Sequence, residues 1–124
     1  MPELANISLT LAHHASSLIS GGVFTIISLP SLKVGADGGK VYSGNLIYSF
    51  SGGNAGGFQP GTVGAVAQII VPSAAQVKVD GSFVLLNGDF GTMFASGTLT
   101  AGTPGLVSGI VEISDAGQTK VTGV

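Results

Sequence analysis

Glycine interrupts this chain so often that long helices are excluded. Of the 124 residues, 21 are glycine, more than twice the usual share of about 7 %, and each glycine inside a helix costs about 1 kcal/mol relative to alanine. Between the glycine, proline, asparagine and aspartate residues lie short runs rich in valine, isoleucine, phenylalanine and threonine, which favour strands. The pattern predicts a compact all-β domain of short strands joined by tight hairpins.

The predicted strands follow one another along the whole chain without a domain boundary. In residues 2–20, the alternation of Ile7, Leu9 and Leu11 has period two, which favours a strand over a helix. Residues 51–61 hold five glycines and one proline and predict a flexible surface loop. A chain of this length forms one ordinary domain, here residues 1–124. The remaining predicted strands are residues 23–29, 40–42, 45–50, 63–71, 76–79, 82–86, 92–99, 109–113 and 119–121.

A small unit recurs along the chain, and each copy ends in an Asp/Gly turn. The copies begin at Leu29, Val71 and Pro104. Glycine accepts a positive φ and aspartate binds its own backbone, so each turn closes a hairpin. Three such hairpins predict a pseudo-threefold arrangement, and chance recurrence in a glycine-rich β protein is the alternative. The turns are Asp37-Gly38, Asp80-Gly81 and Asp115-Ala116-Gly117.

The charge balance and the absence of cysteine exclude several classes of function. The chain has four basic residues, all lysine, and a net charge of −2, so it lacks the basic surface that nucleic-acid binding needs. Without cysteine there is no disulfide, thiolate catalysis or sulfur-bound zinc. Residues 4–32 are uncharged, but Pro30 and several polar groups argue against a membrane-spanning helix. Glu3 stands where a signal peptide requires positive charge.

Few side chains are available for catalysis or metal binding. His13 and His14 are weak metal candidates, because adjacent residues of a strand point to opposite faces. Asp37, Asp80 and Asp115 are explained by turns. The sequence contains neither a Gly-x-Ser-x-Gly elbow nor a nucleotide-binding glycine motif. We therefore expect a protein without catalytic activity or a bound cofactor.

Two long stretches of the chain carry no charge. Residues 41–77 and 90–111 contain no Asp, Glu, Lys or Arg. A domain of this size buries only about two-thirds of its surface, and strand alternation exposes some of these residues. Exposed neutral surface of this kind predicts an interface, while a merely uncharged surface of Gly, Ser and Thr is the alternative.

Residues 73–89 resemble the repeat of PAAR proteins, the tips of contractile injection systems. That repeat runs from small residues through Val-x-Val/Ile-Asn-Gly and Pro-Ala-Ala-Arg to Gly-Asp. In this chain residues 83–86 are Phe-Val-Leu-Leu where the family has Pro-Ala-Ala-Arg. Residues 110–113 are similar to the family's closing strand, and residues 29–41 resemble a degenerate first copy. The matching residues are Val77, Val79, Asp80, Gly81, Gly88 and Asp89.

The resemblance implies a mechanical function. In this family a small β cone caps a trimeric central spike, one copy per trimer, and helps to pierce the target envelope. It implies a particle component of type VI secretion, a phage tail or an extracellular injection particle, made in the bacterial cytoplasm and delivered outside the cell. The target membrane would be contacted only transiently, and effector cargo is a further partner of such tips. Family tips hold zinc with three His and one Cys, but this chain has two His and no Cys, so we do not expect that site.

Two other classes of function stay open from the residues alone. One is another virion or particle component, such as a baseplate, capsid-decorating or fibre protein. The other is a surface-binding β module for carbohydrate or ice. Sugars usually stack on aromatic rings. Apart from phenylalanine, however, the chain offers only Tyr42 and Tyr48, and it has no Trp.

Overall fold

The computed structural model describes residues 4–6, 9–14, 17–28, 34–36, 39–74, 76–79 and 81–117. Strands, turns and irregular segments make up all of these residues, which confirms the predicted all-β class. The described part of the chain contains no helix, and so none that is long and apolar enough to cross a membrane.

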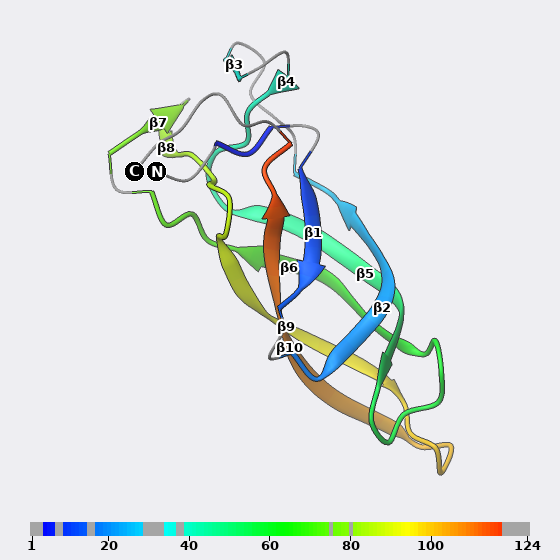
Figure 1. Cartoon of the computed structure of the whole chain (residues 1–124). Coiled ribbons are helices and arrows are strands. Elements are labelled where there is room, and N and C mark those ends of the chain that lie inside the picture. The colour runs from blue at the N-terminus through cyan, green and yellow to red at the C-terminus, as the bar shows by residue number, and fades with distance from the viewer. Residues whose placement is uncertain are drawn as a thin grey trace.

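Most described strands belong to one antiparallel sheet that curls almost into a barrel (Figure 1). The first strand pairs with the last, so β1 and β2 become the two edges and lie on either side of an open seam. The order across the sheet is β1 (Thr10–His13), β10 (Pro104–Asp115), β9 (Phe90–Thr98), β6 (Val63–Ile70), β5 (Leu46–Ala55) and β2 (Ile19–Ile26).

Two small hairpins are inserted into this meander. Strand β3 (Gly35–Ala36) pairs with β4 (Gly39–Lys40), and β7 (Lys78–Val79) pairs with β8 (Ser82–Phe83). In Figure 1 both lie at one end of the elongated molecule, while the turns of the β5–β6 and β9–β10 hairpins lie at the other.

Alternating side chains fill two hydrophobic cores. In β9, Met93 and Ala95 are buried and Phe94 between them is exposed, as the period of a strand requires. The main core fills the barrel, and a satellite core lies beneath the β7–β8 hairpin. The satellite core contains Leu4, Val41, Ala74, Val79, Val84 and Leu86.

The predicted loop at residues 51–61 is wrong in its first half, because β5 continues to Ala55. Glycine makes this extension possible. A Cβ on Gly22 would lie 2.5 Å from the Phe50 ring, and a Cβ on Gly53 would overlap the same ring. The ring therefore lies over backbone that only glycine leaves free, so residues that suggest a loop by composition form a strand.

Strands β2 and β10 also begin earlier than the predicted runs 23–29 and 109–113, at Ile19 and Pro104. The added residues of β2 lie beside β5, and those of β10 lie beside β9. Their backbone groups pair with the backbone of these longer neighbours.

The three repeat units do not form three equal parts of the described structure. The first two units overlap the hairpins β3–β4 and β7–β8, whereas the third closes β10. In the third unit the Gly117 N–H donates to Asp115 Oδ1 at 2.8 Å, the turn that the sequence predicts. Asp37, Gly38 and Asp80 lie outside the described residues. The described strands thus form one unequal meander in place of the predicted pseudo-threefold arrangement.

Gly81 has a φ of 83°, as its place in an Asp/Gly turn predicts. No described atom lies within 4 Å of a Cβ built there, so a side chain would meet backbone strain but no clash. We expect Gly81→Val to lower the free energy of unfolding by about 1 to 3 kcal/mol. Gly81→Asn is the matched control, because asparagine tolerates this conformation, and should cost clearly less. Equal losses in denaturant unfolding would contradict the turn.

Tyr48 is fully buried in the main core, and its hydroxyl has no hydrogen-bond partner among the described residues. Desolvation by burial raises the pKa of the hydroxyl from 10.0 to about 12. The ring itself packs against Phe24, with centroids 5.9 Å apart. The ring contributes to the core, whereas the hydroxyl is an uncompensated polar group.

Tyr48→Phe should therefore leave the free energy of unfolding unchanged or raise it by about 1 kcal/mol. In the wild type the unfolded tyrosine loses its proton near its ordinary pKa of 10.0, before the folded one does at about 12. The contribution of Tyr48 protonation to the free energy of unfolding is therefore fully present below pH 10 and is lost as the pH rises toward 12. Denaturant unfolding at neutral pH and at about pH 11 should show a smaller fall in the variant. An equal fall in both proteins would contradict this assignment.

Candidate docking face

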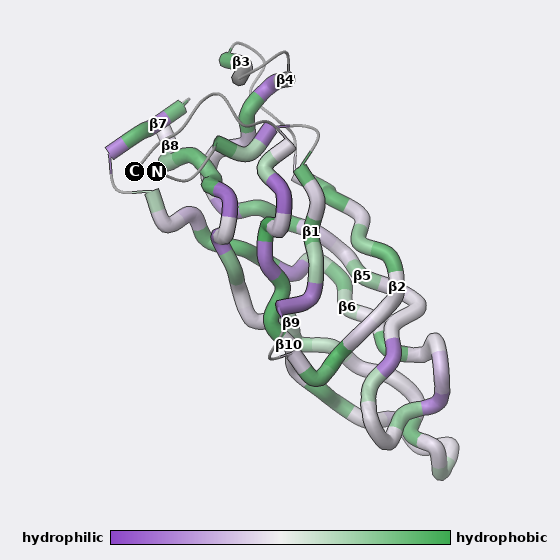
Figure 2. The backbone as a smooth tube through the Cα atoms, viewed as in Figure 1, coloured by the Kyte–Doolittle hydropathy of each residue, from purple (hydrophilic) through white to green (hydrophobic). Residues whose placement is uncertain are grey.

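The sheet brings the two uncharged stretches of the chain together. Residues 41–77 supply β5 and β6, and residues 90–111 supply β9 and most of β10. These four strands are neighbours in the order β10, β9, β6, β5. In Figure 2 the β9–β10 hairpin is pale and green toward its turn, while purple segments mark β4 and β7. One wall of the barrel is thus free of charge from β5 to residues 104–111 of β10.

Large apolar side chains point outward from this wall. Val66 on β6, Phe94 on β9 and Leu106 on β10 are 79 %, 72 % and 87 % exposed. The registers that join Gly64 to Ser96 and Ser96 to Leu106 place these strands side by side. An exposed apolar cluster without charge is typical of an interface. We call this surface the docking face; it comprises Val66, Phe94 and Leu106.

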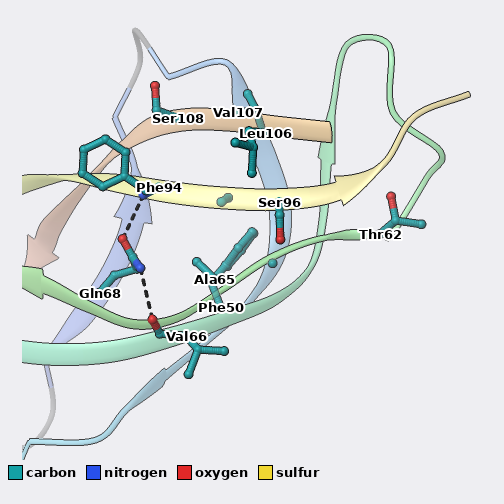
Figure 3. Close-up of a pocket in the computed structure, with 12 residues that line it drawn as sticks. Phe50, Thr62, Ala65, Val66, Gln68, Phe94, Ser96, Leu106, Val107 and Ser108 are labelled. Carbon is teal, nitrogen blue, oxygen red and sulfur yellow. Dashed lines mark hydrogen bonds between the residues drawn. The ribbon is translucent and has the colours of Figure 1, made fainter. Parts of the chain in front are cut away.

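An open groove of about 810 Å³ runs over the boundary between β6 and β9 (Figure 3). Its walls combine the outward side chains of the docking face with small residues that open toward the core, such as Ala65 and Ala95. The described residues that line it carry no charge: Phe50, Thr62, Gly64, Ala65, Val66, Gln68, Phe94, Ala95, Ser96, Leu106, Val107 and Ser108.

A β-bulge in β6 accompanies this groove. The register with β5 shifts between Gln68, opposite Tyr48, and Ala65, opposite Phe50, so β6 carries one extra residue there. Within this segment Ala67 has a φ of 53°, which is unusual for a residue other than glycine. Among the described residues, the recorded register between β6 and β9 is Gly64 opposite Ser96.

Two polar side chains bind backbone groups of β9 on either side of that pair. The Thr98 N–H donates to Thr62 Oγ1 at 3.2 Å, and the Phe94 N–H donates to Gln68 Oε1 at 2.8 Å. Figure 3 shows the Gln68 side chain lying between the two strands. The boundary between β6 and β9 thus depends partly on side chains, where a regular ladder would use backbone alone.

The two histidines have separate places, and the structure gives His13 a structural contact. At the end of β1, His13 Nε2 bonds to the Gly21 carbonyl of β2 at 2.7 Å, across the seam. Its ring packs against Phe24 and Phe50, each with centroids 5.0 Å away. His14 follows the strand, and its N–H donates to the Ile110 carbonyl at 2.8 Å. In the described ranges no group of three or more His, Asp or Glu side chains comes together as potential metal ligands.

The residues that carry the family resemblance form a folding unit. Val79 is buried in the satellite core and Val77 packs against it. Gly81 and Gly88 have φ values of 83° and 88°, and therefore close turns that favour glycine. Asp80 lies outside the described residues. The described motif residues are thus explained by turns and packing.

Asp89 anchors this unit from the inside. Its carboxylate is 4 % exposed, and its Oδ2 accepts the N–H groups of Leu86 at 2.9 Å and Ser73 at 3.3 Å. The Ser73 hydroxyl donates to Oδ1. Backbone bonds between Ile113 and the Gly88-Asp89 pair tie the same turn to β10. The carboxylate faces its own chain and not a ligand site.

The contacts of Asp89 predict a structural role that mutation can test. Asp89→Ala leaves the buried Leu86 N–H, and the partly buried N–H and hydroxyl of Ser73, without this acceptor, and should lower the free energy of unfolding by about 2 to 4 kcal/mol. Asp89→Asn keeps one acceptor oxygen and should lose less. The control is Asp115→Ala, which removes one exposed bond to Gly117 and should cost about 1 kcal/mol. Denaturant unfolding measures all three, and an Asp89→Ala loss no larger than the control would contradict the role.

The sequence predicted the two uncharged stretches and their exposure, but neither their meeting in one wall nor the groove. No sequence pattern marks Thr62, Ala67 and Gln68. A bulge, or a side chain that replaces a backbone hydrogen bond between strands, depends on how two strands distant in the sequence pair. The only signal in the sequence was the absence of charge around them.

Comparison of the chain with protein-family models, with curated proteins and with solved structures finds no match.

Proposed function

We propose that this protein is a structural tip, which caps the trimeric central spike of a contractile injection system and helps to pierce the target envelope. The observation that carries the proposal is the docking face, an uncharged wall with Val66, Phe94 and Leu106 exposed on adjacent strands. A tip must bind one support firmly and needs no chemistry beyond that. An apolar surface suits this task, because burying it in an interface is favourable at roughly 25 cal/mol per Å².

The resemblance to PAAR proteins supports the same function. Val77, Val79 and Gly81 belong to the β7–β8 hairpin and its satellite core, and Asp89 locks the following turn. A motif whose residues build a rigid unit is what a mechanical part requires. The chain would act through stiffness and docking, with one copy on three spike chains.

The fold also suits a part that carries load. The pairing of β1 with β10 joins the first and last strands of the described sheet, and the β5–β6 and β9–β10 hairpins run along the barrel to the end opposite the small hairpins (Figure 1). Force applied along such strands loads many backbone hydrogen bonds together.

A second candidate is another particle component, such as a baseplate, capsid-decorating or fibre protein. The unequal meander favours it, because a single chain that docks on a threefold support would match that support best with three similar hairpins. A component that repeats in its own oligomer has no such requirement.

Co-expression with a trimeric spike protein from the same genome tests the proposal. We expect a complex of one copy with three spike chains by mass measurement, burying on the order of 1,000 Å² or more. Leu106→Asp should abolish the complex, since it brings a charge into an apolar interface. Val23→Asp on β2, where Val23 is 66 % exposed, is the control and should leave the complex intact. A homotrimer that ignores the spike would overturn the tip and favour the second candidate.

A further inference from the structure

The carboxamide of Gln68 occupies the position of a peptide group. Its Oε1 accepts the Phe94 N–H at 2.8 Å, and its Nε2 donates to the Val66 carbonyl at 3.1 Å. One acceptor and one donor of a planar amide thus bind a main-chain donor of β9 and a main-chain acceptor of β6. A peptide group of an extended segment lying between the two strands offers the same pair, because its carbonyl and its N–H point to opposite sides.

The bulge leaves these backbone groups available to a side chain. Because β6 carries an extra residue near Ala67, the described register between β6 and β9 falls at Gly64 and Ser96 and not at Phe94. The Phe94 N–H and the Val66 carbonyl are bonded to the end of the Gln68 side chain (Figure 3). A side chain in an open groove is displaced at lower cost than a strand.

The groove has walls suited to the side chains of such a segment. Val66, Phe94 and Leu106 offer exposed apolar surface on its two sides. Gly64 and Ala95 also line the groove, and their small size leaves room for the side chains of a bound segment. None of the described lining residues is charged, so a charged segment would lose its hydration without a partner. An uncharged extended segment in the groove gains both apolar contact with these side chains and hydrogen bonds to the main chain.

We propose that the groove between β6 and β9 binds an extended, uncharged segment of a partner protein, which displaces the Gln68 carboxamide. A peptide group of that segment accepts the Phe94 N–H and donates to the Val66 carbonyl, while its apolar side chains pack on Val66, Phe94 and Leu106. The inference rests on the proposed function only in placing the partner on the docking face. It names the bound element by its chemistry, whichever particle component supplies it.

A structural role and a displaced-plug role for Gln68 predict opposite effects of its removal. If Gln68 only braces β6 against β9, its loss weakens the fold and any binding in the groove. If Gln68 competes with a ligand, its loss weakens the fold but strengthens binding, since the ligand no longer has to break two hydrogen bonds.

The probe is an acetylated, fluorescently labelled peptide of alternating threonine and valine, with a lysine tail for solubility, added to the full chain. By fluorescence anisotropy we expect Gln68→Ala to bind it about 3- to 10-fold more tightly than the wild type. Phe94→Asp should bind at least about tenfold more weakly, and the control Val23→Asp should bind as the wild type does. A peptide methylated on its backbone nitrogens, which cannot donate to Val66, should also bind more weakly. Unchanged or weaker binding by Gln68→Ala would overturn the proposal.

A second measurement uses the wild type, in case Gln68→Ala does not fold. On adding the peptide, the nuclear magnetic resonance signals of the Gln68 side-chain amide and of the Phe94 N–H should shift, while those of Gly21 on β2 should not. Shifts spread over β2, or no shift at Gln68, would overturn the proposal. Concentration-dependent self-association that blocks the peptide would also overturn it, because the occupant would be a second copy.

These outcomes separate the inference from the proposed function. Peptide binding with the expected Gln68→Ala gain, but no spike complex, would leave the groove assigned and the tip rejected. Formation of the spike complex, together with no effect of the peptide on Gln68 and no gain in peptide binding by Gln68→Ala, would support the tip and reject the groove inference.

Discussion

The Phe50 ring holds together the part of the barrel where the strands are richest in glycine. It is 3 % exposed, packs against His13 of β1 and Phe24 of β2, and lies where Cβ atoms of Gly22 and Gly53 would otherwise be. Glycine strands lose packing and backbone entropy, and one large ring across them restores apolar contact. The ring thereby joins side chains of β1, β2 and β5 beside the seam.

The seam itself is the weak line of the barrel. Strands β1 and β2 share no recorded ladder in the described residues, and the His13 bond to the Gly21 carbonyl crosses between them. Beside it the aromatic rings supply contact in place of backbone bonds. A sheet closed in this way keeps its first and last strands, β1 and β10, paired. The docking face belongs to other strands than β1 and β2, which flank the seam.

That wall is where fold and function meet. The bulge at Ala67 lies in the part of β6 that follows its described pair with β9, Gly64 opposite Ser96, and Thr62 and Gln68 bind the backbone of β9 on either side of that pair. Backbone strain lowers the stability of a fold, as does a side chain that replaces a backbone hydrogen bond between strands. Such features tend to persist where a functional site requires them. The same bulge that weakens the sheet opens a neutral groove among exposed apolar side chains, which links the stability of the barrel to its docking face.

The sequence by itself determined the all-β class, the Gly81 and Asp115 turns and the lack of charge on one region, since these follow from local chemistry: glycine accepts a positive φ, aspartate binds its own backbone, and composition needs no fold. It predicted a loop at residues 51–61, because glycine content alone does not reveal that the Phe50 ring lies over Gly53. It also predicted a threefold arrangement from the recurring Asp/Gly turns, because a local turn does not reveal which strand its hairpin joins. Only the tertiary structure decided that residues 41–77 and 90–111 meet in one wall, that His13 spans a seam, and that Gln68 stands in for a peptide group. Each depends on which distant strands become neighbours, and that choice is made by the packing of the whole core and not by any single segment.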